Sequence, residues 1–356
     1  MGDALYLADG TAWPGLSVGA PGLAVGEAVF GTSMTGYQES LTDPSFARQL
    51  LAFTAPMIGN YGIEPEASES RRPQVAGMLC HEARNARPNA AAGLLDWLCE
   101  HGVVALAEID TRALVRHLRE RGSMLGVVCG NGATREQALA ALAAEPPMEG
   151  RLLAAAVSGQ IAGERPGSAC RVVVIDYGAK ASIVHLLEDA GAAVTVVPHD
   201  ATAAEVLALE PDGVLLANGP GDPGAMDAHV GEVRALADSG TPLFGICLGH
   251  QLLGRALGLE TFKLPFGHRG ANHPVLKHAT GRVLVTSQNH GFAVREPVAG
   301  SEVEITHVSL YDRTVEGLRL SGRPVWSMQF HPEAAPGPHD ARAKLTEFVE
   351  RCRRDS

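Results

Sequence analysis

Three short apolar segments decide the fold of the C-terminal half: Arg-Val-Val-Val-Ile-Asp at 171–176, Gly-Val-Leu-Leu-Ala at 213–217 and Pro-Leu-Phe-Gly-Ile at 242–246. Runs of this length and composition are typical of strands that are buried on both faces of a sheet. Helical patterns lie between them, at 179–190, 203–209 and 228–239. Strands that alternate with helices predict an α/β domain with a parallel sheet and right-handed crossovers.

The first half of the chain follows a different pattern. Segments 4–8 and 27–30 are typical of strands, whereas 94–99 and 113–120 are typical of helices. This mixture predicts a mixed α/β domain, and periodicity alone does not settle its architecture.

The boundary between the halves lies near a run of turn-forming residues at 163–168, Gly-Glu-Arg-Pro-Gly-Ser. An Ala-rich segment of helical composition precedes that run at about 133–156. We therefore predict an N-terminal domain over 1–156, a linker over 157–170 and a C-terminal domain over 171–356.

Composition excludes several classes of function. The chain has 356 residues and a net charge of −11, which argues against a general nucleic-acid binder. No apolar run approaches the roughly 18 residues of a membrane span, and the N-terminus does not resemble a secretory signal. The six cysteines include no Cys-x-x-Cys pair, and the histidines lack ligand spacing, so we predict no metal. We expect a cytoplasmic protein without disulfides.

Cys247 lies in the pattern Gly-Ile-Cys-Leu-Gly at 245–249, between a predicted buried strand and a helix. Such a turn exposes a nucleophile, and the helix N-terminus favours its thiolate form. The backbone N–H of Leu248 is placed to stabilise an oxyanion. The alternative is a buried structural cysteine whose flanking glycines are required only by geometry.

A candidate base follows a strand-like run in the same domain. His331 and Glu333 are two residues apart, so in an extended chain their side chains point to the same face. A carboxylate there can orient one ring nitrogen while the other faces a thiolate. A lone histidine would more often be structural, but this arrangement favours catalysis.

The loop Asn-Gly-Pro-Gly-Asp-Pro at 218–223 directly follows the predicted strand 213–217. Ligands bind at the carboxyl ends of strands in parallel sheets, and Cys247 would lie at the same edge. The loop lacks the Gly-Lys-Ser/Thr sequence of a phosphate-binding P-loop. By itself it would be read as an ordinary turn.

Together, segments 218–223, 244–251 and 331–333 resemble, in order and spacing, the three signatures of class I glutamine amidotransferases. The resemblance covers about residues 170–350. It implies that Cys247, His331 and Glu333 form a triad that hydrolyses glutamine to glutamate and ammonia.

The rest of the chain resembles the carbamoyl-phosphate synthetase small-subunit family. The segments that carry this resemblance are 33–39, 41–45, 58–62, 109–119, 266–274 and 287–294. Glu108 and Gly31 depart from it, since Gly and Asn are expected there. The resemblance implies that L-glutamine is held by Ser45, Gly219, Gly221, Leu248, Gln251, Asn289, Gly291 and Phe292. We favour structural roles for the neighbouring His250 and His290.

The resemblance also implies a partner. A separate large subunit would receive the ammonia and use ATP, Mg²⁺ and bicarbonate to make carbamoyl phosphate. We expect no cofactor in this chain, since nothing in it resembles such an ATP site.

Three rival hypotheses remain. The first is the glutaminase subunit of another amidotransferase, such as one in anthranilate or guanylate synthesis, although those generally lack the N-terminal domain. The second is a free-standing cysteine hydrolase of γ-glutamyl bonds. The third is a scaffold that has lost catalysis, which the intact triad argues against.

Overall fold

The computed structural model describes residues 3–87, 90–161, 164–167 and 170–353. Its contacts divide the chain into two compact units. Unit 1 comprises Met1–Met148 and Pro265–Arg269, and unit 2 comprises Glu149–Leu264 and Gly270–Ser356. The division falls before the predicted linker, because Ala154 of α5 (Ala154–Val157) is buried in a core cluster of unit 2.

Unit 1 is built on a mixed sheet in the order β2-β1-β10-β4-β5-β7-β9-β3. The pairs from β4 to β9 are parallel, and the flanking pairs are antiparallel. A short parallel pair, β6 with β8, lies outside this sheet. The strands are β1 (Ala4–Leu7), β2 (Ala12–Pro14), β3 (Leu16–Ser17), β4 (Leu23–Gly31), β5 (Gln49–Phe53), β6 (Met57–Ile58), β7 (Gly77–Leu79), β8 (Glu82–Ala83), β9 (Val104–Ala107) and β10 (Met124–Cys129).

The helices of unit 1 pack on both faces of its sheet. On one face α3 (Thr111–Arg121) buries Leu114 and Leu118, and the Asp110 side chain caps it by accepting from the Ala113 N–H at 2.9 Å. The other elements are α1 (Tyr37–Thr42), η1 (Pro44–Phe46), η2 (Pro65–Ala67), α2 (Leu94–Glu100) and α4 (Arg135–Ala144).

The Ala-rich segment 133–156 is helical only in part. A capping box of Thr134 and Gln137 starts α4, which ends at Ala144. Pro146 and Pro147 follow at once, and proline cannot continue the hydrogen-bonded helix. The helical composition of this segment therefore does not produce a helix over residues 145–153.

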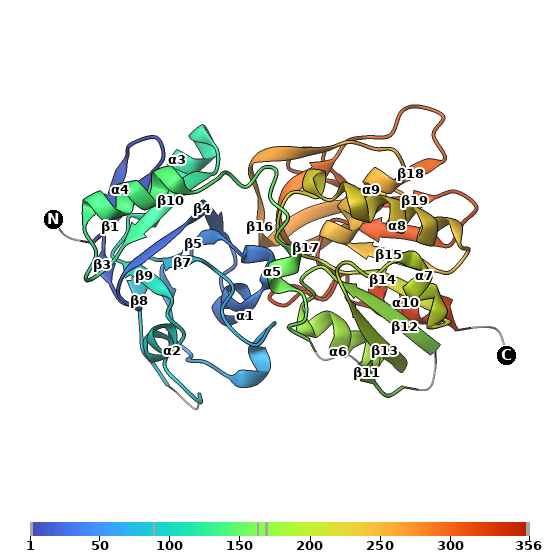
Figure 1. Cartoon of the computed structure of the whole chain (residues 1–356), viewed down its shortest axis with the longest axis horizontal. Helices are drawn as coiled ribbons and strands as arrows, with labels where there is room; N and C mark the ends of the chain where they lie inside the picture. Colours follow the sequence, from blue (N-terminus) through green and yellow to red (C-terminus); the bar gives the residue numbers. More distant parts are fainter. Residues whose placement is uncertain (1–2, 88–89, 162–163, 168–169, 354–356) are drawn as a thin grey trace. The chain divides into compact units, whose positions relative to one another are not determined.

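Unit 2 contains the predicted parallel sheet, extended by antiparallel strands, in the order β11-β13-β12-β14-β15-β20-β19-β18-β16-β17 (Figure 1). Five neighbouring strands, β13, β12, β14, β15 and β20, pair in parallel. Beyond β20, the pairs β20–β19, β19–β18 and β18–β16 are antiparallel. Residues 265–269 of β16 are grouped with unit 1. The strands are β11 (Glu164–Arg165), β12 (Cys170–Asp176), β13 (Ala192–Pro198), β14 (Gly213–Leu216), β15 (Leu243–Ile246), β16 (Thr261–Lys277), β17 (Val283–Val294), β18 (Val303–Ser309), β19 (Val315–Leu320) and β20 (Val325–Met328).

Helices pack on both faces of the parallel strands (Figure 1). One core cluster joins α6 and α10 to the sheet, and a second joins α7, α8 and α9 to it. Both faces of the central strands are therefore buried, which explains their continuous apolar sequences. The helices are α6 (Ala181–Asp189), α7 (Ala203–Ala208), η3 (Pro223–Ala225), α8 (Asp227–Asp238), α9 (Leu248–Ala256) and α10 (Ala343–Cys352).

The candidate site residues follow three neighbouring parallel strands, β14, β15 and β20, and lie at one edge of the sheet. The Gly/Pro loop follows β14, Cys247 follows β15, and His331 follows β20 after two intervening residues. Because these strands run in the same direction, their carboxyl ends meet at the same edge of the sheet. Among the described residues, no helix has the length and apolar character that crossing a membrane requires.

Candidate active site

Cys247 is the residue at which β15 turns into α9, and its backbone is strained. It has φ 53° and ψ −103°, a positive φ that costs a non-glycine residue on the order of 1–3 kcal/mol. Its N–H donates to the Met328 carbonyl at 2.9 Å, which fixes the turn to β20. A Cβ on Gly245 would lie 2.7 Å from the Gly249 oxygen, and one on Gly249 would lie 2.2 Å from the Leu216 oxygen. Both glycines are therefore required for this tight turn.

His331 and Glu333 form a buried pair just after β20. The Nδ1 atom of His331 lies 2.6 Å from Oε1 of Glu333, and both side chains are almost completely buried. The His331 N–H donates to the Ser287 carbonyl at 2.9 Å, so β17 holds this segment in place. Because Glu333 engages Nδ1, the ring nitrogen that remains available is Nε2.

Electrostatics make this histidine strongly basic. Burial by itself lowers the pKa of His331, but the negative charges of Glu333 and then of Cys247 outweigh it and raise the pKa to about 10. Burial raises the pKa of Glu333, but the cations Lys180 and His331 reverse this and hold that pKa well below its usual range. The site therefore favours an imidazolium next to the sulfur, which is the arrangement that stabilises a thiolate.

Lys180 is a further buried residue of this site, and the sequence did not indicate it. It lies immediately before α6, its side chain is 2% exposed, and its Nζ donates to Oε1 of Glu333 at 2.9 Å. It also donates to the Ala335 carbonyl. Glu333 is thus held between a lysine and a histidine on the same oxygen. No spacing rule links positions 180 and 333, since the fold alone brings them together.

His250 lies in the first turns of α9 but does not take part in the triad. Its Nδ1 is 2.9 Å from the Ser327 hydroxyl, and complete burial lowers its pKa to about 3. The ring is therefore neutral at pH 7 and joins α9 to β20. This environment fits the structural role predicted for it.

The residues predicted to hold glutamine also interact with one another in unit 2. The Gln251 side chain donates to the Phe292 carbonyl at 2.8 Å, and the Cys247 Sγ lies 3.5 Å from the Asn289 carbonyl. Gly221 has φ +98°, which suits glycine. A Cβ on Gly219 would lie 2.2 Å from the Tyr177 oxygen and 3.0 Å from Cδ2 of Leu248, the residue after Cys247. Strand β17 and the loop after β14 are therefore both held close to the nucleophile turn.

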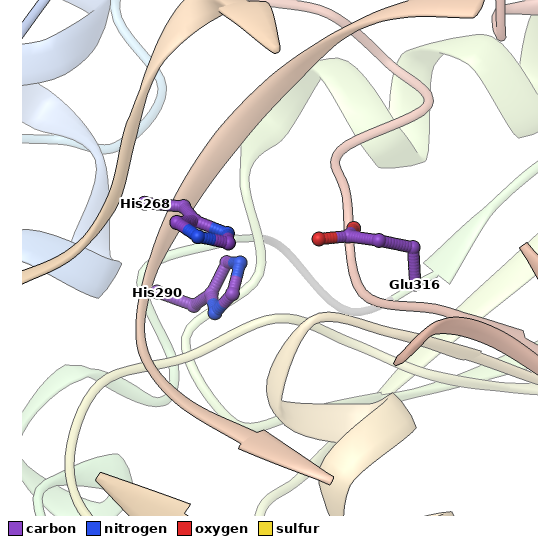
Figure 2. Close-up of side chains that lie close together, drawn as sticks. All are labelled: His268, His290 and Glu316. Carbon is purple, nitrogen blue, oxygen red and sulfur yellow. The ribbon is translucent and has the colours of Figure 1, made fainter. Parts of the chain in front are cut away.

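His290 and Glu316 are two further buried polar residues of unit 2, drawn in Figure 2. A ring nitrogen of His290 and a carboxylate oxygen of Glu316 lie within 4.8 Å of each other. The same carboxylate accepts from the Gln288 side chain at 2.8 Å, and His290 Nδ1 lies 2.7 Å from the Phe292 carbonyl. His268, also drawn, belongs to the segment grouped with unit 1. That the chain binds no metal stays a prediction.

Comparison with known proteins identifies the family. The model of the glutamine amidotransferase class-I family matches residues 173–351, and that of the carbamoyl-phosphate synthase small chain CPSase domain matches residues 5–128. A carbamoyl phosphate synthase small chain of Symbiobacterium thermophilum is 48% identical over 96% of this chain and 96% of its own length. That of Thioalkalivibrio sulfidiphilus is 46% identical over 97% of this chain and 96% of its own. The chain belongs to the carbamoyl phosphate synthase small chain family.

Among solved structures, a glutamine amidotransferase from Thermotoga maritima matches over 47% of this chain and 77% of its own chain. Its sequence identity is 16% and the TM-score is 0.37. The two family models match separate parts of the chain, residues 5–128 and residues 173–351.

One of the residues predicted to hold glutamine, Ser45, lies in unit 1. Ser45 is buried in η1, where its N–H donates to the Asp43 carboxylate at 2.9 Å. The other seven predicted glutamine-binding residues all belong to unit 2. A contact between Ser45 and glutamine stays a prediction.

Proposed function

We propose that this chain is the glutaminase subunit of a carbamoyl phosphate synthase, in which Cys247 hydrolyses L-glutamine to glutamate and ammonia. A separate large subunit would use the ammonia with ATP, Mg²⁺ and bicarbonate, and both chains would work in the cytoplasm. The observation that carries the proposal is the strained Cys247 turn at the same sheet edge as the buried His331–Glu333 pair. Membership of the small chain family supports the identity of the partner.

The reaction begins with a proton already on the histidine. With its pKa raised to about 10, His331 is an imidazolium at pH 7 and stabilises the Cys247 thiolate. The thiolate attacks the carboxamide carbon of glutamine, and the oxyanion is stabilised by the N–H groups of Gly221 and Leu248. Leu248 is the first residue of α9, so its N–H has no acceptor within the helix.

The second half of the reaction returns the enzyme to its starting state. His331 gives its proton to the leaving nitrogen, ammonia departs, and a γ-glutamyl thioester remains on Cys247. His331 then takes a proton from water, whose oxygen attacks the thioester and releases glutamate. Glu333 and Lys180 keep the ring oriented while its charge changes.

We expect the large subunit to control the rate of glutamine hydrolysis by this chain. A glutaminase that works without its synthetase wastes glutamine and releases ammonia into water. We therefore infer that the isolated chain is slow and that the loaded large subunit shifts the glutamine site toward an active state. Such coupling is typically about 1–3 kcal/mol.

The experiment compares glutamate release by the isolated chain with release after addition of the large subunit, ATP and bicarbonate. We expect at least about a tenfold increase, the factor that about 1.4 kcal/mol gives. The Cys247→Ser variant in the same mixtures measures glutamate produced by any other route. An isolated chain that already works at the rate of the loaded complex would refute the coupling and favour a free-standing hydrolase.

A further inference from the structure

A groove of about 530 Å³ lies on unit 2 between α10 and strands β18, β19 and β20. It does not contain the triad residues or the residues predicted to hold glutamine. The groove lies on the face from which Trp326 and Met328 contribute to the α10 core cluster. Its volume is within the range of roughly 300–1,000 Å³ that is typical of small-ligand sites.

Five permanent cations line this groove: Lys277, Arg319, Arg323, Lys344 and Arg351. The concentration is unusual, because the whole chain has a net charge of −11 and only four lysines, two of which are here. The three helix positions that contribute, 344, 347 and 351, recur at the spacing of one face of α10. Positive charge is therefore gathered on an otherwise acidic protein.

Three of these cations already have carboxylate partners. Arg319 pairs with Glu304 at 2.5 Å, Arg323 with Asp238 at 2.8 Å and Lys344 with Glu347 at 2.6 Å. Such ion pairs are common on solvated surfaces, and each contributes little to the stability of the fold. Among the described residues, Lys277 and Arg351 have no carboxylate within ion-pair distance. The groove therefore has an excess of two positive charges.

One of the two excess cations is held in place. The Arg351 guanidinium lies over the Trp326 ring, 5.0 Å from its centre, and Trp326 stacks on Phe244 at 5.6 Å. A cation fixed in this way loses less side-chain entropy when it binds a ligand.

A buried histidine, His307, also lines the groove and lies near its cations. His307 is 3% exposed, and its pKa is lowered to about 4 by burial and then by the cations Lys277 and Lys344 and by His278. The ring therefore stays neutral at pH 7, next to a positively charged opening. This is the electrostatic environment that attracts an anion.

We propose that the groove binds a small phosphate-bearing molecule through Lys277 and Arg351. A phosphate monoester has a charge of about −1.5 to −2 at pH 7, which matches the excess of two cations. An arginine guanidinium can donate two parallel hydrogen bonds to the oxygens of one phosphate. The volume leaves room for the organic part of such a molecule. A site of this kind is independent of glutamine hydrolysis, so the proposed function and this inference can fail separately.

The test is isothermal titration calorimetry of the full chain with inorganic phosphate, ribose 5-phosphate and adenosine monophosphate, each at constant ionic strength. We expect saturable one-to-one binding with a Kd of about 1 mM or tighter for at least one phosphate probe. If inorganic phosphate binds as tightly as the two esters, the phosphate group alone is recognised. If an ester binds more tightly, the organic part is recognised too.

The variants separate this site from general charge effects. K277Q/R351Q should weaken binding at least about tenfold, whereas the control R116Q/R121Q, with the same charge change on α3, should leave it within about twofold. Because Arg351 packs on Trp326, K277Q alone is also titrated, and circular dichroism checks that each variant folds. Absence of saturable binding, equal losses in the control, or equally tight binding of succinate would overturn the proposal.

Discussion

Substituting Met for Lys180 removes an ammonium group that shares one oxygen of Glu333 with His331. The Lys180 Nζ lies 2.9 Å from Oε1, and His331 Nδ1 lies 2.6 Å from the same atom. The other oxygen, Oε2, has no hydrogen-bond partner among the described residues. The carboxylate is therefore stabilised almost entirely through these two cations.

The magnitude follows from the burial of the pair. At 2.9 Å and an effective dielectric constant of about 20, the gross attraction between the charges is about 6 kcal/mol. Desolvation offsets part of this attraction when the pair forms. Removing one partner of a buried ion pair typically costs about 3–5 kcal/mol, because the other charge remains buried. We expect Lys180→Met to lower the free energy of unfolding by that amount and to raise the pKa of Glu333.

Lys263→Met is the matched control. Lys263 pairs with Glu149 at 2.7 Å, but Glu149 is half exposed and the pair lies at the surface. A surface pair contributes about 0–1 kcal/mol, so this variant should differ little from the wild type. Urea unfolding followed by circular dichroism measures both. If the two variants lose equal stability, Lys180 does not support the triad in the way described.

Two further predictions concern the triad. His331 carries the proton transfers, which typically raise the rate on the order of 10²–10⁴-fold. His331→Asn should therefore lower kcat for glutamate release more than Glu333→Gln does. The opposite order, with both variants folded, would contradict these roles. Because the folded-state pKa of His331 is raised from 6.5 to about 10, its charge contributes stability that is fully present below pH 6.5 and is lost as the pH rises toward 10. Unfolding free energies measured between about pH 7 and 10 should fall by on the order of 2–4 kcal/mol in the wild type, and a slope just as steep in His331→Gln would count against this assignment.

Local sequence predicted the parts of the fold that depend on short-range pattern. The continuous apolar segment at 171–176 became β12, and the segment at 242–246 became β15, because burial on both faces requires such sequences. The glycines at 245 and 249 marked the Cys247 turn, since only a residue without a side chain fits there.

Long-range electrostatics could not be predicted in the same way. Lys180 reaches Glu333 across 153 positions, and nothing near either residue indicates the other. Glu108 shows a different limit. It stands where the family is expected to carry Gly, and its φ of 60° explains why glycine would suit that position. The groove next to α10 depends on residues from several separate elements, so no motif indicated it.

The measurement that tests the central claim most directly uses Cys247→Ser in the complex with the large subunit. Carbamoyl phosphate is assayed with either glutamine or ammonium chloride as the nitrogen source, and ATP and bicarbonate are constant. A serine hydroxyl is far less ionised than a thiol, whose reference pKa is about 8.5, so the glutamine-dependent rate should be abolished. The ammonia-dependent rate should remain near that of the wild type, because the synthetase itself is unchanged. A variant that still uses glutamine at nearly the wild-type rate would show that Cys247 is not the nucleophile.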